Sequence, residues 1–431
     1  MMTEETDVVV VGAGGGGAVL ALALAQQGIR TVVLDQAAGP PTGLRGELLQ
    51  PNGQQVLDRL GVLKNLPEAA TRSIRKFHFC GAGGARLCSI DYGDLPPPYN
   101  RAIVTLPNVA HHAIVDAVGR QSAAALRYAT SFVELIREGQ RIAGATVRGP
   151  AGPYRIKSRL VVGADGAFSK VRESLAIPAD LHLYPEGYLI AILDSPEALN
   201  ESFYYVGHKQ ILGLFPATGN QVYLFYMIPR GAYDSIKENG IPALTQAWTR
   251  IAPRFASLFA KLSDWSQTAY MPTGRVRTPR WVADGAALIG DAAHAMNPHA
   301  SQGRMQAMVD AMTLADLIPA CLESGDCSAA RLSSFETARR PHVTMLQRLA
   351  DQQVFYWNTG NPLIAWVRDR VFRTLDRNAR LRYQVLSTTA GLRKTAPLSL
   401  IDRLIAAGFL PDPYPMRYAD QSSPARRHGC D

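Results

Sequence analysis

The stretch Val8-Val9-Val10-Val11-Gly12-Ala13-Gly14-Gly15-Gly16-Gly17 joins four valines directly to a glycine-rich turn. An alanine- and leucine-rich segment, Ala18–Gln27, follows, then Gly28 and a second β-branched run, Thr31–Leu34. Glycine is the residue expected just past the end of a helix. The pattern therefore predicts a buried strand over Asp7–Val11, a tight turn, a buried helix and a second strand, which together form a β-α-β unit.

The glycines of this turn have the spacing G-x-G-x-x-G at Gly12, Gly14 and Gly17. The first glycine permits the tight turn, the second lets a diphosphate approach the backbone, and the third lets helix and strand pack closely. Asp35 ends the second strand about 20 residues later, where a carboxylate binds a ribose hydroxyl. A glycine-rich turn alone occurs in many α/β proteins. The strand, the helix and the acidic residue together predict a dinucleotide site, for FAD or for NAD.

Composition narrows the class of protein. The 431 residues are 47% hydrophobic and 19% charged, which is typical of a folded chain of two or three domains. Glu4, Glu5 and Asp7 precede the apolar segment Val8–Ala25, so that segment lacks the basic flank of a signal peptide. The five cysteines form no C-x-x-C pair and their number is odd. We therefore expect reduced thiols, no metal site and a cytoplasmic location.

The remaining chain predicts an α/β fold with an inserted sheet. Residues 73–97 are strand-like, and apolar and aromatic residues alternate from about Leu181 to Tyr270, as in an antiparallel sheet. Further elements are expected as strands at Arg155–Val162 and Ala286–Ile289, and as helices at Val109–Gly119, near Met305–Ile318 and through Leu332–Ala407. The fold class is a Rossmann-like nucleotide-binding domain interrupted by an antiparallel-sheet domain, with C-terminal helices. The predicted division is 1–72, 98–178 and 272–345 for the nucleotide domain, 73–97 and 179–271 for the sheet domain, 346–413 for the helical region and 414–431 for a flexible tail.

Two further glycine motifs follow predicted strands. Gly163-Ala164-Asp165-Gly166 closes one strand, and alone it is an ordinary turn. Gly290-Asp291-Ala292-Ala293-His294 closes another, with Pro298 and Gly303 downstream. The small residues of the latter motif let backbone lie against a flat ligand, and Asp291 offers a carboxylate to a polyol hydroxyl.

The three motifs, in this order and at these separations, closely resemble the FAD-dependent monooxygenases of the para-hydroxybenzoate hydroxylase type over roughly residues 6–345. The stretch Gly46–Pro51 is also similar to ubiquinone-biosynthesis hydroxylases and squalene epoxidases. The family's G-M-N motif is Gly303-Arg304-Met305 here. The resemblance implies a set of FAD-binding residues: Gly12, Gly14, Gly17 and Asp35 at the ADP half, Arg45 and Asp165 near the phosphates, and Gly290, Asp291, Pro298 and Gly303 along the ribityl chain and flavin.

The resemblance also implies the reaction. NAD(P)H reduces FAD, O2 reacts with the reduced cofactor, and one oxygen atom passes to an electron-rich carbon of the substrate. We expect the substrate wall to come from the antiparallel sheet and the Pro298 loop, with strand alternation placing Tyr223 and Phe225 on one face and Tyr226 on the other. The candidate wall residues are Tyr188, Tyr204, Tyr223, Phe225 and Tyr226. His208 and His299 are candidate bases for a phenol, although a lone histidine is more often structural.

Three functions remain open at this point. The first is hydroxylation of an aromatic or quinone-like small molecule in specialised metabolism. The second is epoxidation or hydroxylation of a polyprenyl or other lipophilic alkene. The third is a flavin-dependent oxidoreductase that transfers no oxygen.

The basic residues of 361–408 raise the question of whether the chain binds nucleic acid or a membrane. They lie on predicted helices and not in an aromatic-lined groove, which disfavours a nucleic-acid partner. They allow a weak, salt-sensitive membrane contact, although packing on the FAD domain is the simpler interpretation. The expected apolar face is Trp366, Val367, Val371 and Phe372, and the surrounding charges are Arg368, Arg370, Arg373, Arg377 and Arg380.

Overall fold

The computed structural model describes residues 2–43, 47–106 and 108–413. Its first unit is the predicted β-α-β: strand β2 (Val8–Val11), helix α1 (Gly15–Ala25) and strand β3 (Thr31–Leu34), with β2 and β3 parallel. All four β2 valines are buried, and α1 is buried from Gly16 onward, because the sheet is covered on both faces. The expected α/β fold is confirmed.

The β-α-β unit belongs to a six-stranded sheet in which neighbouring strands are parallel except at one edge. The strand order brings the ends of all three glycine-bearing strands together, since β2 lies next to β13, and β13 next to β20. In spatial order the strands are β19 (Val282–Ala283), β20 (Ala286–Leu288), β13 (Leu160–Gly163), β2, β3 and β9 (Ala124–Arg127).

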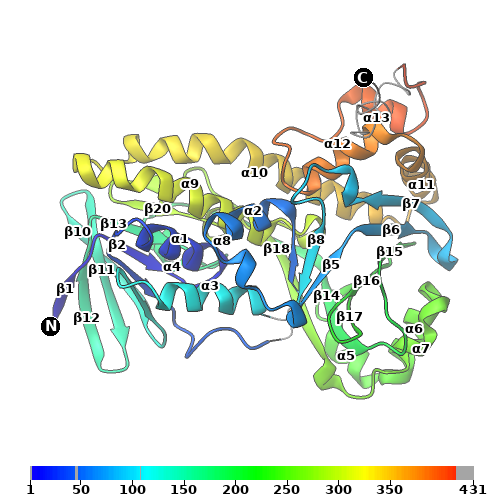
Figure 1. Ribbon diagram of the computed structural model, residues 1–431, viewed down its shortest axis with the longest axis horizontal. Helices are drawn as coiled ribbons and strands as arrows, with labels where there is room; N and C mark the ends of the chain where they lie inside the picture. Colours follow the sequence, from blue (N-terminus) through cyan, green and yellow to red (C-terminus); the bar gives the residue numbers. More distant parts are fainter. Residues whose placement is uncertain (1, 44–46, 107, 414–431) are drawn as a thin grey trace, which may run out of the picture.

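A second, seven-stranded sheet lies beside the six-stranded sheet along the long axis of the molecule (Figure 1). Two of its strands precede the others by about a hundred residues, and β6 joins β15 in a parallel pair within an otherwise antiparallel sheet. In spatial order the strands are β18 (Thr268–Arg277), β14 (Asp180–Asp194), β17 (Gln221–Pro229), β16 (Ile211–Pro216), β15 (Ser202–Val206), β6 (Lys76–Cys80) and β7 (Arg86–Asp91). A small three-stranded sheet has the spatial order β4 (Glu47–Leu49), β8 (Ala102–Thr105) and β5 (Thr71–Ile74). The chain passes through this sheet on its way from the six-stranded sheet to β6 and again on its way back.

One predicted strand is wrong. Residues 155–162 do not form a single strand, because the chain leaves one sheet at Lys157 and enters another at Leu160. The turn is held by hydrogen bonds from the Arg159 and Leu160 N–H groups to the Asp7 carbonyl. The first half belongs to a four-stranded sheet that the sequence did not predict, in the order β1 (Thr3–Glu5), β12 (Gly152–Lys157), β11 (Arg141–Gly149) and β10 (Ser131–Glu138).

The longest helices cover the six-stranded sheet, and the last helices gather beyond β6 and β7 (Figure 1). Helix α9 packs on α1, α2 and α10. By length and composition α9 could cross a membrane, but 61% of its most apolar stretch is buried inside the fold, as in a core helix. The helices are α2 (Pro51–Arg59), α3 (Val109–Gly119), α4 (Lys170–Ser174), α5 (Tyr233–Glu238), α6 (Ile241–Ile251), α7 (Ala256–Phe259), α8 (Asp291–His294), α9 (Gly303–Ser324), α10 (Ala329–Trp357), α11 (Pro362–Arg377), α12 (Ala379–Thr389) and α13 (Leu400–Ala406).

The C-terminal region is helical, as expected, but its helices are separated by capped breaks. Asn361, Asn378 and Ser399 each accept hydrogen bonds from the first turn of the following helix. Short polar side chains of this kind satisfy backbone N–H groups that have no partner within the helix. The region therefore folds back on itself and packs on the edge of the seven-stranded sheet.

Candidate active site

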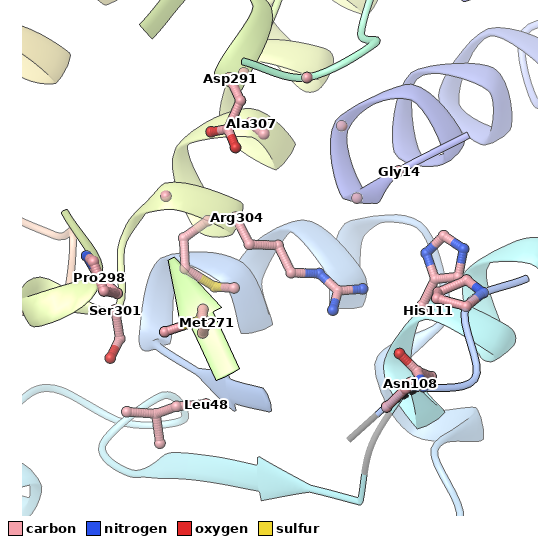
Figure 2. Close-up of a pocket in the computed structure, with 18 of the residues that line it drawn as sticks. Gly14, Leu48, Asn108, His111, Met271, Asp291, Pro298, Ser301, Arg304 and Ala307 are labelled. Atoms are coloured by element: carbon pink, nitrogen blue, oxygen red, sulfur yellow. Dashed lines mark hydrogen bonds between the residues drawn. The ribbon is translucent and has the colours of Figure 1, made fainter. Parts of the chain in front are cut away.

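One cavity of about 890 Å³ joins the glycine motifs to the aromatic face of the seven-stranded sheet. It extends from the first turn of α1 to the side chains of β14–β17, so residues from both large sheets share a single space. Figure 2 shows the part of the cavity between Gly14 and Met271 of β18. Its volume is in the range of ligand sites. The predicted residues that line it are Gly14, Asp35, Gly290, Asp291, Pro298, Gly303, Tyr188, Tyr204, Tyr223, Phe225 and His299.

The three positions of the first motif hold glycine for different structural reasons. Gly12 has φ +103°, and a Cβ there would lie 2.4 Å from the Ala164 carbonyl oxygen. A Cβ on Gly17 would lie 1.9 Å from the Gly12 carbonyl oxygen. Both glycines are thus required by the fold. Gly14 differs, because a Cβ there would meet nothing within 4 Å, and the residue lines the cavity. The open space at Gly14 leaves room for a ligand.

Asp35 is positioned at the end of β3 as the motif predicts. Its carboxylate accepts hydrogen bonds from the Ala13 N–H and the Ala37 N–H, each at 2.9 Å. A carboxylate has lone pairs for further donors, and Asp35 also lines the cavity. It can therefore accept a ribose hydroxyl. The first turn of α1 contains no acidic residue, so the positive end of that helix faces the cavity without a competing charge.

In the second motif, the Asp165 carboxylate has a different role from the predicted one near the phosphates. Asp165 accepts hydrogen bonds from the Ser169 hydroxyl and the Val171 N–H, so its carboxylate is used at the start of α4. Its neighbours Ala164 and Gly166 line the cavity. Arg172 connects this motif to the third one by donating to the Ala292 carbonyl at 2.8 Å. Arg45, predicted near the phosphates, lies outside the described residues.

The third motif is held by a buried ionic network. Gly290 has φ +58°, and its N–H donates to Asp310 at 3.0 Å. Asp310 is fully buried and also pairs with His294 at 2.5 Å and Arg339 at 2.8 Å. Burial opposes the charged form, but His294 and Arg339 hold the pKa of Asp310 below its ordinary value. This network fixes the turn that presents Asp291 to the cavity (Figure 2).

The aromatic wall of the cavity is made by alternating residues of the antiparallel strands. The Phe225 ring contacts Tyr188 and Tyr204, with centroid distances of 5.4 and 5.1 Å. Tyr226 points to the opposite face and packs edge-on against Trp248, so its prediction as a wall residue is wrong. The alternation that the sequence predicted accounts for this difference. Phe215, Met271 and Leu48 complete the wall without having been predicted.

The two candidate histidines have different surroundings. His208 is exposed on the turn after β15 and does not belong to the cavity lining. His299 lines the cavity, is only 8% exposed, and its Nε2 lies 2.5 Å from the Tyr188 hydroxyl. Its Nδ1 is buried and has no hydrogen-bond partner among the described residues. Burial lowers the pKa of His299 to about 3, so the imidazole is neutral near pH 7.

These features fit FAD. The open space at Gly14 and the helix N-terminus suit a diphosphate, and Asp35 suits a ribose. The turn at Gly290 suits the ribityl chain, and the same cavity continues to an apolar wall that suits a flat ring system. When bound, FAD supplies the redox chemistry.

The chain belongs to a family of FAD-binding proteins. The family model described as "FAD binding domain" matches residues 5–350. The 6-methylpretetramide 4-monooxygenase of Streptomyces rimosus is 28% identical over 382 residues, covering 88% of this chain and 90% of the relative. The p-nitrophenol 4-monooxygenase PnpA of Pseudomonas putida DLL-E4 has the same fold, with a TM-score of 0.77 at 20% identity over 91% of this chain and 100% of that one.

The chain is an FAD-dependent monooxygenase that uses NAD(P)H as electron donor. The predicted likeness to two other classes is also confirmed. The 3-demethoxyubiquinol 3-hydroxylase of Escherichia coli is 25% identical, covering 91% of this chain and 100% of the relative. The squalene monooxygenase 1,1 of Brassica napus is 26% identical, covering 95% and 83%. The oxidoreductase that transfers no oxygen is no longer a candidate.

Proposed function

We propose that the chain hydroxylates an aromatic or quinone-like small molecule of specialised metabolism that carries a ring hydroxyl or carbonyl group. The observation that supports this most is the Tyr188–His299 pair, a polar group set into an otherwise aromatic wall. A buried polar atom such as His299 Nδ1 is usually satisfied by a partner. A substrate oxygen is a suitable one. The relative named for 6-methylpretetramide supports this substrate class.

In this proposal the chain's residues place the substrate and exclude water. Tyr188, Tyr204 and Phe225 enclose the ring, and the hydrogen bond from Tyr188 orients the His299 imidazole toward the substrate oxygen. A neutral imidazole with a lowered pKa is a weak base. His299 is therefore a positioning residue for the substrate, and proton removal from a phenol is not its main role. Gly12, Gly14, Gly17, Asp35, Gly290, Asp291, Pro298 and Gly303 hold FAD.

Replacing His299 by glutamine or Tyr188 by phenylalanine is expected to raise KM for a phenolic substrate about 3- to 10-fold, the value of one neutral hydrogen bond. The pH profile of kcat/KM should show no inflection near pH 6.5 that is present in the wild type and absent from His299→Gln. The reason is that a pKa of about 3 keeps the imidazole neutral from pH 5 to 8. Steady-state kinetics over that range measure both effects. A wild-type inflection near 6.5 that disappears in His299→Gln would show that the residue acts as a titrating base.

Oxidation of a lipophilic alkene is the second candidate, favoured by the similarity to a squalene monooxygenase over most of the chain. Product analysis with polyprenyl compounds and with phenols, each supplied with NAD(P)H and O2, separates the two. Formation of an epoxide from the alkene, with no hydroxylated product from the phenols, would favour this second candidate.

We further propose a contact with an anionic membrane. Phe372 and Arg368 of the predicted face are buried. Trp366 of that face and Leu363 on the same helix are exposed. Further exposed apolar side chains lie on and after α13, with exposed arginines on α11 and α13. Such a basic, apolar surface is complementary to an anionic membrane. The exposed apolar residues are Leu400, Ile401, Leu404, Phe409 and Leu410, and the arginines are Arg370, Arg373, Arg377 and Arg403. We also propose a cytoplasmic location. It is compatible with such a contact, and the four described cysteines are free thiols, as is usual in that compartment.

Vesicle co-sedimentation tests this contact. Binding to anionic vesicles is expected at low salt and should fade at about 1 M salt, where the Debye length falls to about 3 Å. The variant Leu400→Glu with Ile401→Glu should bind less, whereas Val133→Glu, at an exposed position on β10, serves as the matched control. Absence of wild-type binding at low salt would reject the proposal.

A further inference from the structure

A second cavity, which we call the α11 groove, lies on the outer face of α11. It has a volume of about 480 Å³ and shares no lining residue with the larger cavity. Helix α11 packs on α12 and α13 at one end of the molecule (Figure 1). The residues that line the groove are Trp366, Arg370, Arg373, Thr374, Arg377, Asn378 and Gly408.

The sequence of α11 divides its side chains between two faces. Arg368, Phe372 and Leu375 are buried, and the Phe372 ring stacks on Phe79 of β6 with a centroid distance of 4.7 Å. The groove residues recur at spacings of three and four, which places them on one exposed stripe of the helix. This stripe consists of Trp366, Arg370, Arg373 and Arg377. One face of α11 therefore packs on the sheet, and the other presents three guanidinium groups to the groove.

The groove is strongly basic. Like charges at spacings of three and four residues repel one another on a helix surface. No acidic residue that the structure describes lines the groove, and the acidic side chains of residues 362–413 have partners other than these three arginines. The partners are Arg368 for Asp369, the Ser89 N–H for Asp376, Arg380 for Asp402, and Arg380 and Asn378 for Asp412. An anion from outside the chain is therefore the complementary ligand.

One of the three arginines is held in place before any ligand binds. Arg370 Nη2 donates to the Gly408 carbonyl at 2.9 Å, and the guanidinium lies over the Trp366 ring, 5.4 Å from its centroid. Gly408 has φ +75°, and a Cβ there would collide with this guanidinium. A side chain that is already ordered loses less conformational freedom when it binds. The arrangement at Gly408 therefore favours binding of a ligand at Arg370.

We propose that the α11 groove binds a ligand that carries two adjacent phosphate groups. A guanidinium suits phosphate because its planar fork of donors matches two phosphate oxygens, and every basic residue of α11 is an arginine. Arg370 and Arg377 are seven residues apart, about 10 Å along a helix, so two phosphate groups meet the three arginines better than one. The ligand is a free diphosphate or a membrane lipid with two phosphates. The site goes beyond the oxygen transfer and beyond the membrane contact, which needs only charge and an apolar surface.

Calorimetry of the FAD-loaded protein with inorganic pyrophosphate tests the free ligand, because bound FAD already fills the cofactor site. Arg373→Gln is expected to raise the dissociation constant of pyrophosphate about 10- to 100-fold, as for the loss of a hydrogen bond between charged groups. Arg373→Lys keeps the charge without the fork and should recover only part of the affinity. Arg403→Gln is the matched control, since Arg403 is exposed on α13 outside the groove. The melting temperature shows that each variant is folded.

Vesicles test the lipid source. Cardiolipin carries two phosphates joined by one glycerol, and twice as many phosphatidylglycerol molecules supply the same charge without that pairing. A preference of the wild type for cardiolipin vesicles, lost in Arg373→Lys with Arg377→Lys, would assign the site to a lipid. Both lysines keep the charge, so a general electrostatic contact would survive in that variant. Pyrophosphate binding without this preference would assign the site to a free diphosphate.

The proposal would be overturned if the wild type neither bound pyrophosphate nor preferred cardiolipin. It would also be overturned if Arg403→Gln lost as much affinity as Arg373→Gln, because the binding would then reflect general surface charge. Absence of all vesicle binding would reject the membrane contact, whereas the pyrophosphate experiment would still decide whether the groove is a site.

Discussion

Replacing Gly14 by valine is expected to give a folded protein that purifies without its yellow cofactor. The fold has room for the side chain, since a Cβ at this position meets no atom within 4 Å and the backbone has φ −67°. That room is where the diphosphate must approach the backbone. FAD affinity should fall by about two powers of ten or more, because the valine both blocks the approach and covers the helix N–H groups.

Two matched glycines make this prediction specific. Gly119→Val, at the exposed end of α3 where a Cβ also meets nothing, should retain FAD. Gly17→Ala should fail to fold properly, since its Cβ would lie 1.9 Å from the Gly12 carbonyl oxygen. Absorbance of the purified proteins and circular dichroism measure the two properties separately. Folded Gly14→Val with full FAD occupancy would show that the cofactor does not lie on this turn.

Replacing Asp310 by alanine is expected to lower the free energy of unfolding by about 3–5 kcal/mol, the cost of breaking a buried ion pair. The substitution leaves Arg339 buried without its carboxylate and removes the acceptor of the Gly290 N–H. FAD affinity should fall as well, because Asp291 follows Gly290 directly. Urea unfolding with and without FAD measures both losses.

The same helix offers a control for this variant. Asp316 pairs with Arg59 at the surface, with both side chains more than half exposed, so Asp316→Ala should cost less than about 1 kcal/mol. The double variant Asp310→Leu with Arg339→Met removes both charges and should recover much of the stability. It should not recover FAD affinity, since the Gly290 N–H still lacks its acceptor. A stability loss for Asp310→Ala as small as that for Asp316→Ala would contradict this account of the network.

Local patterns of the sequence were sufficient to predict the cofactor half of the fold. The bounds of β3 and of α3 agree with prediction, because a β-branched run and a long apolar helix each carry their own periodicity. The four-stranded sheet was not predicted, since its strands have mixed burial and its first strand, β1, pairs with β12, which lies some 150 residues away in sequence. The predicted domain division stays a prediction.

The site could be predicted only where a motif fixes the backbone. Gly14, Asp35 and Asp291 line the cavity because their strands end at one edge of a parallel sheet. Asp165 also follows such a strand, yet its carboxylate accepts hydrogen bonds from the Ser169 hydroxyl and the Val171 N–H at the start of α4. The Tyr188–His299 pair joins residues 111 positions apart. No local pattern of the sequence signals that contact.

With FAD and an aromatic substrate bound side by side in this cavity, the enzyme is expected to transfer one oxygen atom of O2 to the substrate ring. The most direct measurement is mass spectrometry of the product formed by the FAD-loaded enzyme from 18O2, NAD(P)H and a panel of fused-ring phenols. At least one phenol is expected to stimulate NAD(P)H oxidation and to gain a single 18O atom. Hydroxylation of an aromatic substrate would be contradicted if no member of the panel stimulated oxidation, or if the oxygen gained by the product came from water.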